Sequence, residues 1–521
     1  MFSRLLRTTL GFGRGKAKAK VAKATPLETE EGVDAGVAKT RVFGLGTDGK
    51  LGLGDTEARG TAQPLAFLGA ARMRAVAVGV HHTVGVVETA AAGHGVLFGW
   101  GSNFYGQAGC AAVDADTKSG AASVLSPGDD AEDLDAVDLP ARVRLLVPAA
   151  ALANIDVCAV AAGAFHAVAL DANGALWSWG AGCLGRDNEL YDSTAILVDF
   201  FAARRRRVTH VQASGHVTIA VAAGPSPTQS ATPSSAHQQT ATSEVYVWGY
   251  FRDNRLHFRK STSPILLADA LKYSHVSLVA ADGNVFAVVG ANNKARPSIS
   301  LYGSFDKKSD CEMPMYPLYL EIENLPQVYP DKPDAIVELD PSVSLNHIKS
   351  VVLFRDIGFI VFENGTVQFF INSKQNEPTK SRIENSNQPI IITPQICTIF
   401  GDCAVQPVDS ISINPFGAIV IYKNKSNENS PRKIVYWPFK KNETDSIVDY
   451  ATEGVGAYGL VGSDILDYIA SREGIILADS NEQSVASSAL SSQSSSLSSN
   501  SSSVITSLAA VGWEHAIFHQ S

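Results

Sequence analysis

The feature of this sequence that most constrains its fold is a short motif that recurs imperfectly along most of the chain. Its clearest copy, residues 96–109, is an apolar run followed by Gly-Trp-Gly, a polar Ser-Asn pair and a closing Gly-Gln-Ala-Gly. An earlier copy runs from Val42 to Asp55, and a later one from Leu176 to Gly185. Because such repetition predicts a series of equivalent structural units, it determines the fold class before any single residue does.

A second repeated unit, an apolar run that carries Gly-x-x-His, alternates with the first. It is clearest at residues 76–82, 160–170 and 508–518. Weaker copies begin at Val211, Leu278, Val351, Ile411 and Tyr468. Short runs rich in Val and Ile and punctuated by Gly predict buried β-strands.

The repeated residues have structural uses that explain why they recur. Glycine permits a positive φ or close backbone approach, an aromatic ring buries a large area, and histidine can fill core space while bonding to backbone. We therefore assign a structural role to the repeat signature: Gly44, Gly46, Gly79, His82, Trp100, Gly101, Gly106, Gly163, His166, Trp179, Gly180, Trp248, Gly249, Gly303, Gly512 and His515.

These motifs resemble the repeat of the regulator of chromosome condensation family. The resemblance is strong over residues 41–185 and 505–519, whereas only the strand–aromatic rhythm persists over 245–478. It implies an all-β, seven-bladed β-propeller over residues 41–521, with four strands per blade and long inserted loops. Seven copies of the first motif, roughly 65 residues apart, agree with that number of blades.

The second unit occurs eight times, which is one more than seven blades need. Either the segment at 464–478 or the segment at 505–519 is surplus, or the last one closes the ring with the N-terminal strand. Closure of that kind removes exposed sheet edges.

Residues 1–27 have the character of a mitochondrial targeting presequence, followed by a linker at 28–40. Apolar residues share one face of a short helix, arginines flank them, and no acidic residue precedes Glu28. This pattern is typical of transit peptides; the alternative is a disordered basic tail. Together with the repeats, it identifies the chain as similar to a mitochondrially targeted, fungal-type member of the family, in the matrix or on the inner-membrane face.

Three segments have the composition of mobile insertions, at 111–140, 224–243 and 480–503. The first is strongly acidic, the second is rich in Pro, Ser, Thr and Gln, and the third is nearly all serine. Such segments bury too little apolar surface to offset the entropy of ordering.

Charge and cysteine usage restrict the partners and the compartment. The net charge is −9, and without the seven basic residues that precede Glu28 it becomes −16, with 36 basic against 52 acidic residues. That balance does not suit DNA binding. Six scattered cysteines indicate neither a zinc ribbon nor a disulfide framework, so we expect a reducing compartment. No stretch is long and apolar enough to span a membrane, although peripheral association stays possible.

No catalytic, cofactor or metal motif stands out. The Gly-x-Gly-x-x-Gly at residues 44–49 is followed by Leu-Gly-Leu-Gly, which does not continue as the helix that a dinucleotide site needs. Blade symmetry would spread the repeated histidines around a ring, and Cys397 with Cys403 is interpreted as a chance pair of thiols. The basic run 204–207 has three interpretations: a solvated loop, a contact for acidic protein or phosphate groups, or a nuclear-localisation-like patch.

These observations predict a non-enzymatic protein that binds other proteins. Resemblance to mitochondrial family members implies work in respiratory-complex assembly or mitochondrial translation, with inner-membrane complex or ribosome components as partners. The alternative is a guanine-nucleotide exchange factor for a small GTPase, the activity of the family's founding member. A third class is an enzyme that uses Cys or His. Specificity would then lie in unrepeated loops such as 111–140 and 186–207.

Overall fold

A computed structural model describes most of the repeat region. The described residues are 40–68, 71–88, 95–103, 105–109, 136–142, 145–146, 155–187, 189–223, 243–252, 258–267, 273–283, 285–292, 296–303, 333–372, 389–401, 406–414, 417–423, 433–438, 466, 475–478, 508–511 and 515–519. The expected presequence at 1–27, nearly all of the expected linker, the serine-rich segment at 480–503 and the strand candidate at 468–471 lie outside them.

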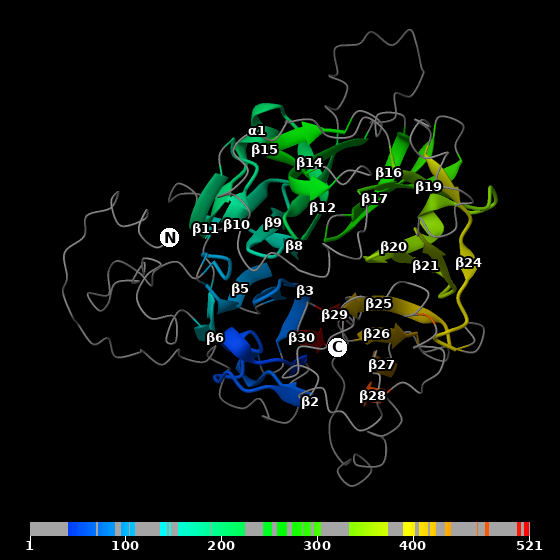
Figure 1. Ribbon diagram of the computed structural model, residues 1–521. Helices are drawn as coiled ribbons and strands as arrows, with labels where there is room; N and C mark the ends of the chain where they lie inside the picture. The colour runs from blue at the N-terminus through cyan, green and yellow to red at the C-terminus, as the bar shows by residue number, and fades with distance from the viewer. Residues whose placement is uncertain are drawn as a thin grey trace, which may run out of the picture.

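The described strands form seven sheets arranged as the blades of one ring (Figure 1). In each blade four strands run antiparallel from an innermost strand outward, and each innermost strand contacts the innermost strands of both neighbouring blades. The all-β, seven-bladed propeller is therefore confirmed. We number the blades along the chain from 1 to 7, and blade 7 combines the two ends of the repeat region.

Blades 1 to 3 each come from one continuous stretch of the chain. Blade 1 contains β3 (Arg72–Val78), β4 (His82–Glu88), β5 (Gly95–Ser102) and β6 (Ala136–Arg142). Blade 2 contains β8 (Val157–Ala162), β9 (His166–Asp171), β10 (Leu176–Cys183) and β11 (Glu189–Leu197), with β7 (Leu145–Leu146) added at its outer edge. Blade 3 contains β12 (Arg207–Ser214), β13 (Val217–Ala223), β14 (Ser243–Arg252) and β15 (Phe258–Leu266).

Blades 4 to 6 follow the same plan in the part of the chain where the repeat is weak. Blade 4 contains β16 (Tyr273–Asp282), β17 (Val285–Asn292), β18 (Pro297–Tyr302) and β19 (Ala335–Glu338), with β23 (Ile390–Ile392) added in parallel. Blade 5 contains β20 (Ile348–Phe354), β21 (Ile357–Phe362), β22 (Val367–Ile371) and β24 (Gln395–Ile396). Blade 6 contains β25 (Val408–Asn414), β26 (Gly417–Tyr422), β27 (Lys433–Pro438) and β28 (Ile475–Ala478).

Blade 7 closes the ring by joining the two ends of the repeat region. It contains β29 (Leu508–Val511), β30 (His515–His519), β1 (Thr40–Gly44) and β2 (Arg59–Pro64). β30 pairs antiparallel with β1, with Thr40 opposite His519. Of the interpretations of the eighth repeat unit, closure of the ring by residues 505–519 is thus the one the structure supports. Residues 475–478 form an outer strand of blade 6 instead.

The hydrophobic core lies between facing blades rather than at the centre of the ring. Between blades 1 and 2, for example, Val84 belongs to the same buried cluster as Trp177. Between blades 3 and 4, Ile219 belongs to the same buried cluster as Phe286, whose ring stacks on Tyr302 with centroids 5.0 Å apart. The second strands β4, β9, β13, β21 and β26 are buried on both faces, which explains why their sequences are largely apolar throughout rather than alternating.

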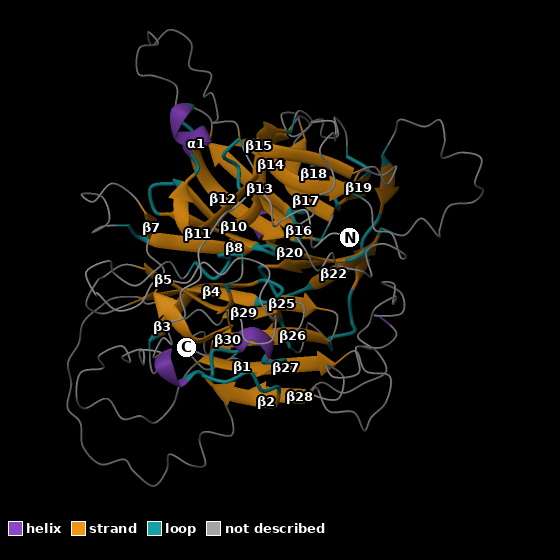
Figure 2. Cartoon of the chain, turned by 60° about the vertical axis from the view of Figure 1, so that its left-hand side comes forward, coloured by secondary structure: helices purple, strands orange, loops and turns teal. Residues whose placement is uncertain are grey.

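Helices are short and lie outside the blades, as Figure 2 shows for α1 (Asp199–Ala203) beside β12. The other described helical turns are η3 (Thr47–Gly49), η4 (Ala66–Leu68) and η8 (Leu345–His347). In the described part of the chain, no helix has the length and apolar character needed to cross a membrane.

The structure changes three expected boundaries, whereas every blade has the expected four strands, and two blades carry one additional strand. The acidic insertion expected at 111–140 overlaps β6, which begins at Ala136, while Ser243 belongs to β14 and Thr40 to β1. Blades 2 and 4 each have a fifth strand, because a short extended segment pairs in parallel with the outermost strand.

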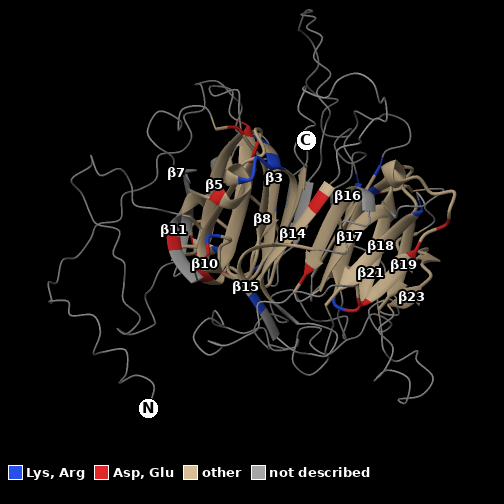
Figure 3. Cartoon of the chain, turned by 90° about the horizontal axis from the view of Figure 1, so that it is seen from above, with Lys and Arg blue, Asp and Glu red and all other residues tan. Residues whose placement is uncertain are grey.

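The propeller has two faces with different contents. We call one the turn face, because there the first strand of each blade turns into the second, as at residues 79–81 and 163–165. We call the other the terminal face, because Thr40 and His519 lie there, as does α1. Figure 3 shows that charged residues gather near the ends of the strands, toward these faces, whereas the strand bodies are nearly free of charge.

Candidate interaction surfaces

The aromatic residues of the repeat signature bind each blade to the blade before it. Trp100, Trp179 and Trp248 lie on the third strands of blades 1 to 3 and are fully buried. The indole Nε1 of Trp100 donates a hydrogen bond to the carbonyl oxygen of Lys50 (3.1 Å), in blade 7. That of Trp179 donates to the carbonyl oxygen of Gln107 (3.0 Å), in blade 1. In blades 1 and 2 the Gly-rich turn of the preceding motif is thus the acceptor for the tryptophan, whereas the buried Trp248 Nε1 has no hydrogen-bond partner in the described part of the chain.

The glycine that follows the aromatic position requires a backbone that only glycine adopts readily. Its φ is positive in five blades: Gly44 (117°), Gly101 (95°), Gly180 (96°), Gly249 (112°) and Gly303 (92°). A Cβ on Gly180 would lie 2.3 Å from the carbonyl oxygen of Phe165, in the turn between the first two strands of the same blade. The neighbouring Ala181 N–H donates to that carbonyl (2.8 Å), so the approach itself serves a backbone bond.

The Gly-x-x-His unit is a packing device in which the histidine ring occupies the space beside the glycine. A Cβ on Gly79 would lie 2.2 Å from Cε1 of His82, and a Cβ on Gly163 would lie 2.2 Å from Cε1 of His166. His82 and His166 are the first residues of β4 and β9, and His515 is the first residue of β30. The Nε2 of His166 lies 2.8 Å from the Oγ1 of Thr218 in blade 3, so this ring also joins neighbouring blades.

Burial keeps these histidines neutral. Desolvation, together with a smaller effect of neighbouring histidines, lowers the pKa of His82 and of His166 from 6.5 to about 3. Desolvation also lowers the pKa of His216, in the next blade, to about 4. A neutral ring that is buried between strands has no access to a substrate, and among the described residues no cluster of His, Cys, Asp and Glu could hold a metal ion.

The signature residues Gly46 and Gly106 lie at turns. A Cβ on Gly46 would lie 2.0 Å from the carbonyl oxygen of Glu57, and Gly106 has a φ of 70° in the turn after β5. Gly512 lies outside the described residues.

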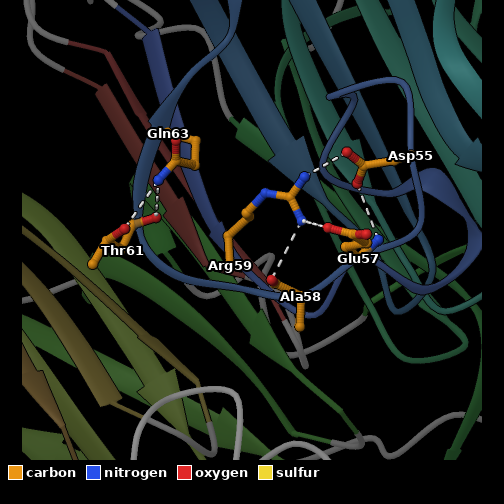
Figure 4. A network of polar contacts seen from close by, with 6 residues as sticks. All are labelled: Asp55, Glu57, Ala58, Arg59, Thr61 and Gln63. Carbon is orange, nitrogen blue, oxygen red and sulfur yellow. Dashed lines mark hydrogen bonds and ion pairs between the residues drawn. The ribbon is translucent and has the colours of Figure 1, made fainter.

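The loop that Gly46 approaches is held by a small polar network, shown in Figure 4. Arg59 pairs with Asp55 and with Glu57 (3.2 Å to the latter), and the Glu57 N–H donates to Asp55 Oδ1 (3.0 Å). These bonds are all local, and their side chains are at least partly exposed to solvent. They therefore fix one turn of blade 7 and contribute little to stability.

A row of polar residues that the repeat comparison missed lies at the start of the innermost strands. In six blades a β-bulge places one extra residue there: Arg74, Cys158, Thr209, Ser277, Lys349 and Asp409. The sequence signal for this row is a polar or cysteine residue just after the first core residue of each of these six innermost strands. It is weak because the six residues share no chemistry.

The members of this row bond in two ways. The uncharged ones bond within their own blade to the residue twelve positions later: Cys158 Sγ to the Leu170 carbonyl (3.3 Å), Thr209 Oγ1 to the Val221 carbonyl (3.2 Å) and Ser277 Oγ to the Val289 carbonyl (3.3 Å). The charged ones pair between blades, Arg74 with Asp156 (2.6 Å) and Lys349 with Asp409. The side chain therefore replaces the ladder bond that a bulge interrupts, or it links two blades.

Two sequence features do not belong to the repeat signature: the basic run and the pair of neighbouring cysteines. The basic run 204–207 lies on the terminal face between α1 and β12. Cys397 is buried in the core between blades 5 and 6, while its expected neighbour Cys403 lies outside the described residues.

One repeat of the chain matches a known repeat family, and the whole fold is similar to solved structures. The profile of the Regulator of chromosome condensation (RCC1) repeat matches residues 157–186, which span β8 to β10. Human WBSCR16 is similar in structure, with 13% identity, a TM-score of 0.50 and coverage of 92% of this chain and 98% of that chain.

Two structures of a yeast protein are similar as well. Prp20p from Saccharomyces cerevisiae, described together with its binding to Gsp1p and histones, has 14% identity and a TM-score of 0.53 over 92% of this chain and 91% of that chain. Yeast RCC1 (Prp20) bound by Kap60 has 14% identity and a TM-score of 0.53 over 98% of this chain and 96% of that chain. At these identities the likeness shows the fold alone. The chain is thus a seven-bladed β-propeller that carries a repeat of the RCC1 type in blade 2.

Proposed function

We propose that the chain is a non-enzymatic mitochondrial protein that binds other proteins and supports their assembly. One observation carries this proposal: the Trp, Gly and His residues that recur from blade to blade are used in contacts within and between blades. What is left for a partner is the unrepeated polar surface on the two faces. A rigid ring that presents such surfaces binds without making or breaking covalent bonds.

The mitochondrial part of the proposal rests on the acid-free, Arg-rich residues 1–27. The partners we propose are components of inner-membrane complexes or of the mitochondrial ribosome. The test is to tag the chain at its C-terminus, fractionate cells, and co-purify partners from isolated mitochondria. A purely nuclear or cytosolic signal would contradict the address, and a tagged chain that recovers no protein above a tag-only control would contradict the binding role.

A guanine-nucleotide exchange factor for a small GTPase is the second candidate. It is supported by the structural similarity to Prp20p, which was described together with its binding to Gsp1p. An exchange factor also needs no catalytic group of its own, because it only opens the nucleotide site of its partner. Release of a fluorescent guanine nucleotide from candidate organellar GTPases would accelerate in the presence of the chain; unchanged release from all of them leaves the assembly role.

A further inference from the structure

The corner of the terminal face between blades 2 and 3 carries a concentration of arginines that the propeller does not fully use. α1 follows the outer strand of blade 2, and Arg204 to Arg207 connect it to β12, the innermost strand of blade 3. Three of these arginines are exposed to solvent, and Arg206 is half-buried. We call Arg204, Arg205 and Arg207, with the ring of Phe200, the arginine corner.

Arg206 is excluded from the arginine corner because it has a structural partner. Its guanidinium donates to both carboxylate oxygens of Glu244, at 2.6 and 2.8 Å, and the Tyr246 hydroxyl donates to the same carboxylate (2.7 Å). This bidentate pair holds the corner against β14 and balances the charge of the Glu244 carboxylate, so Glu244 does not neutralise the exposed arginines.

Arg204 is held flat against the surface. Its guanidinium carbon lies 3.7 Å from the centre of the Phe200 ring, and Nη1 donates to the Phe200 carbonyl (3.2 Å). The Phe200 ring is itself fixed edge-on to Phe201 and Tyr246, at 5.3 and 5.4 Å. A stacked guanidinium keeps its in-plane N–H groups directed outward, in the geometry that accepts a carboxylate.

Arg207 is fixed along its length. Its Nη2 donates to the Ala172 carbonyl in the turn after β9 (2.9 Å), and its side chain lies over Gly174, where a Cβ would fall 2.1 Å from Arg207 Cγ. Less side-chain entropy is lost on binding when a cationic group is already held in place.

Arg205 occupies a position that favours glycine. It has a φ of 54°, its N–H donates to the Ala202 carbonyl (3.0 Å), and the N–H of Arg206 donates to the Phe201 carbonyl (2.9 Å). This is the Schellman arrangement at a helix C-terminus, in which the residue with positive φ is usually Gly. Within the described part of the chain, the Arg205 side chain has no hydrogen bond or ion pair that would repay the backbone strain.

We propose that the arginine corner binds a short Asp- and Glu-rich segment of a partner protein. Two preorganised guanidinium groups and one unpaired arginine provide the positive charge, and Phe200 provides an adjoining apolar surface. The charge of the whole chain, −9, opposes binding of an extended polyanion such as nucleic acid or an anionic membrane. A short acidic segment would contact only the arginine corner, and salt screens its repulsion from acidic residues more than about 8 Å away.

The test uses the full-length chain and a fluorescein-labelled octapeptide of alternating Glu and Ser. We expect Arg205→Gly to bind the peptide roughly five- to tenfold more weakly, because a charge-assisted contact is lost. The same substitution should raise the denaturation midpoint, because glycine relieves the strain at positive φ. A structural role for Arg205 would move binding and stability together, so the opposite signs are diagnostic.

The matched control is Lys260→Gln, which removes the same charge from β15, where the lysine lies over Tyr250. It should bind the peptide as the unmodified chain does. Equal binding by Arg205→Gly and the unmodified chain would overturn the proposal. So would absence of peptide binding, or tighter binding of a single-stranded oligonucleotide or of phosphatidylserine vesicles than of the peptide.

This inference rests on the binding role proposed above, and the two fail differently. If the tagged chain recovers no partner from mitochondria, the proposed function is wrong. If it recovers partners and Arg205→Gly recovers the same set in the same amount, the binding role stands and the arginine corner is not its surface.

Discussion

Blades 1 to 3 and blades 4 to 6 reach the same architecture by different contacts. In the first group, the buried indoles of Trp100 and Trp179 donate to turns of the preceding blade, and His166 contacts Thr218 of the next blade. In the second group, Tyr302 and Phe370 replace tryptophan in blades 4 and 5, and Trp437 in blade 6 is only partly buried. Clusters rich in Ile, Val and Phe fill the space between blades there, and polar links remain, such as Arg355 N–H to Asp282 (2.7 Å). Adjacent blades therefore pack together whenever apolar side chains fill the space between their sheets, and the repeated motif is one of several ways to fill it.

The largest effect that would test this comparison comes from Trp179→Ala in blade 2. It removes a fully buried ring together with its hydrogen bond to Gln107, so we expect a loss of about 3–5 kcal/mol in the free energy of unfolding. The matched change in blade 5 is Phe359→Ala, which removes a fully buried ring without such a bond. Denaturant unfolding measures both; a smaller loss for Trp179→Ala than for Phe359→Ala would contradict the role of the indole bond.

Loss of the ion pair between Lys349 of blade 5 and Asp409 of blade 6 should have the next largest effect on stability. Lys349→Met leaves Asp409, which is almost fully buried, without its cation. Because Lys349 is partly exposed and its charge is screened, we expect a loss of about 2–3 kcal/mol, below that for a fully buried pair. The double variant Lys349→Met with Asp409→Leu should recover much of it. A double variant less stable than the single one would show that the link is not what holds these inner strands.

The buried histidines make the stability of blades 1 to 3 depend on pH. Their folded-state pKa values, about 3 for His82 and His166 and about 4 for His216, lie below the ordinary 6.5. The unfolded chain thus binds more protons below pH 6.5, and stability falls as the pH decreases through that value. Each histidine contributes about 2 kcal/mol of this loss at pH 5. His216→Phe should therefore lose about 2 kcal/mol less than the unmodified chain between pH 7.5 and 5; parallel losses would refute the assignment.

The smallest effect comes from the row of bulged residues. Thr209→Val removes the bond to the Val221 carbonyl at the inner strand of blade 3, and we expect a loss of about 0.5–1 kcal/mol. Hydrogen exchange of the β12 and β13 amides would show whether the loss is confined to this blade, as expected of a bond within one sheet.

The fold could be predicted from sequence because its signal is repeated, whereas the surfaces could not. Each aromatic-Gly pair has a backbone or packing requirement that shows in the residues themselves, such as the positive φ of Gly101 and Gly180. The polar row has no such common chemistry, since the bulge accepts Arg, Cys, Thr, Ser, Lys or Asp. The basic run was visible, but the pairing of Arg206 with Glu244, 38 residues away, depends on the register of β14. The sequence therefore shows that this run is positively charged, but it does not show which of its arginines remain available to a partner.

The central claim is that the repeated residues build the ring and that unrepeated surface residues bind partners. Its most direct test is quantitative recovery of partners from mitochondria by three tagged full-length chains: unmodified, Trp179→Phe and Arg205→Gly. Trp179→Phe loses the indole donor to Gln107 but keeps most of the buried ring. We predict that it recovers the partners in proportion to its folded fraction, while Arg205→Gly, which is at least as stable, recovers fewer. Full recovery by Arg205→Gly together with selective loss of partners by folded Trp179→Phe would contradict the claim.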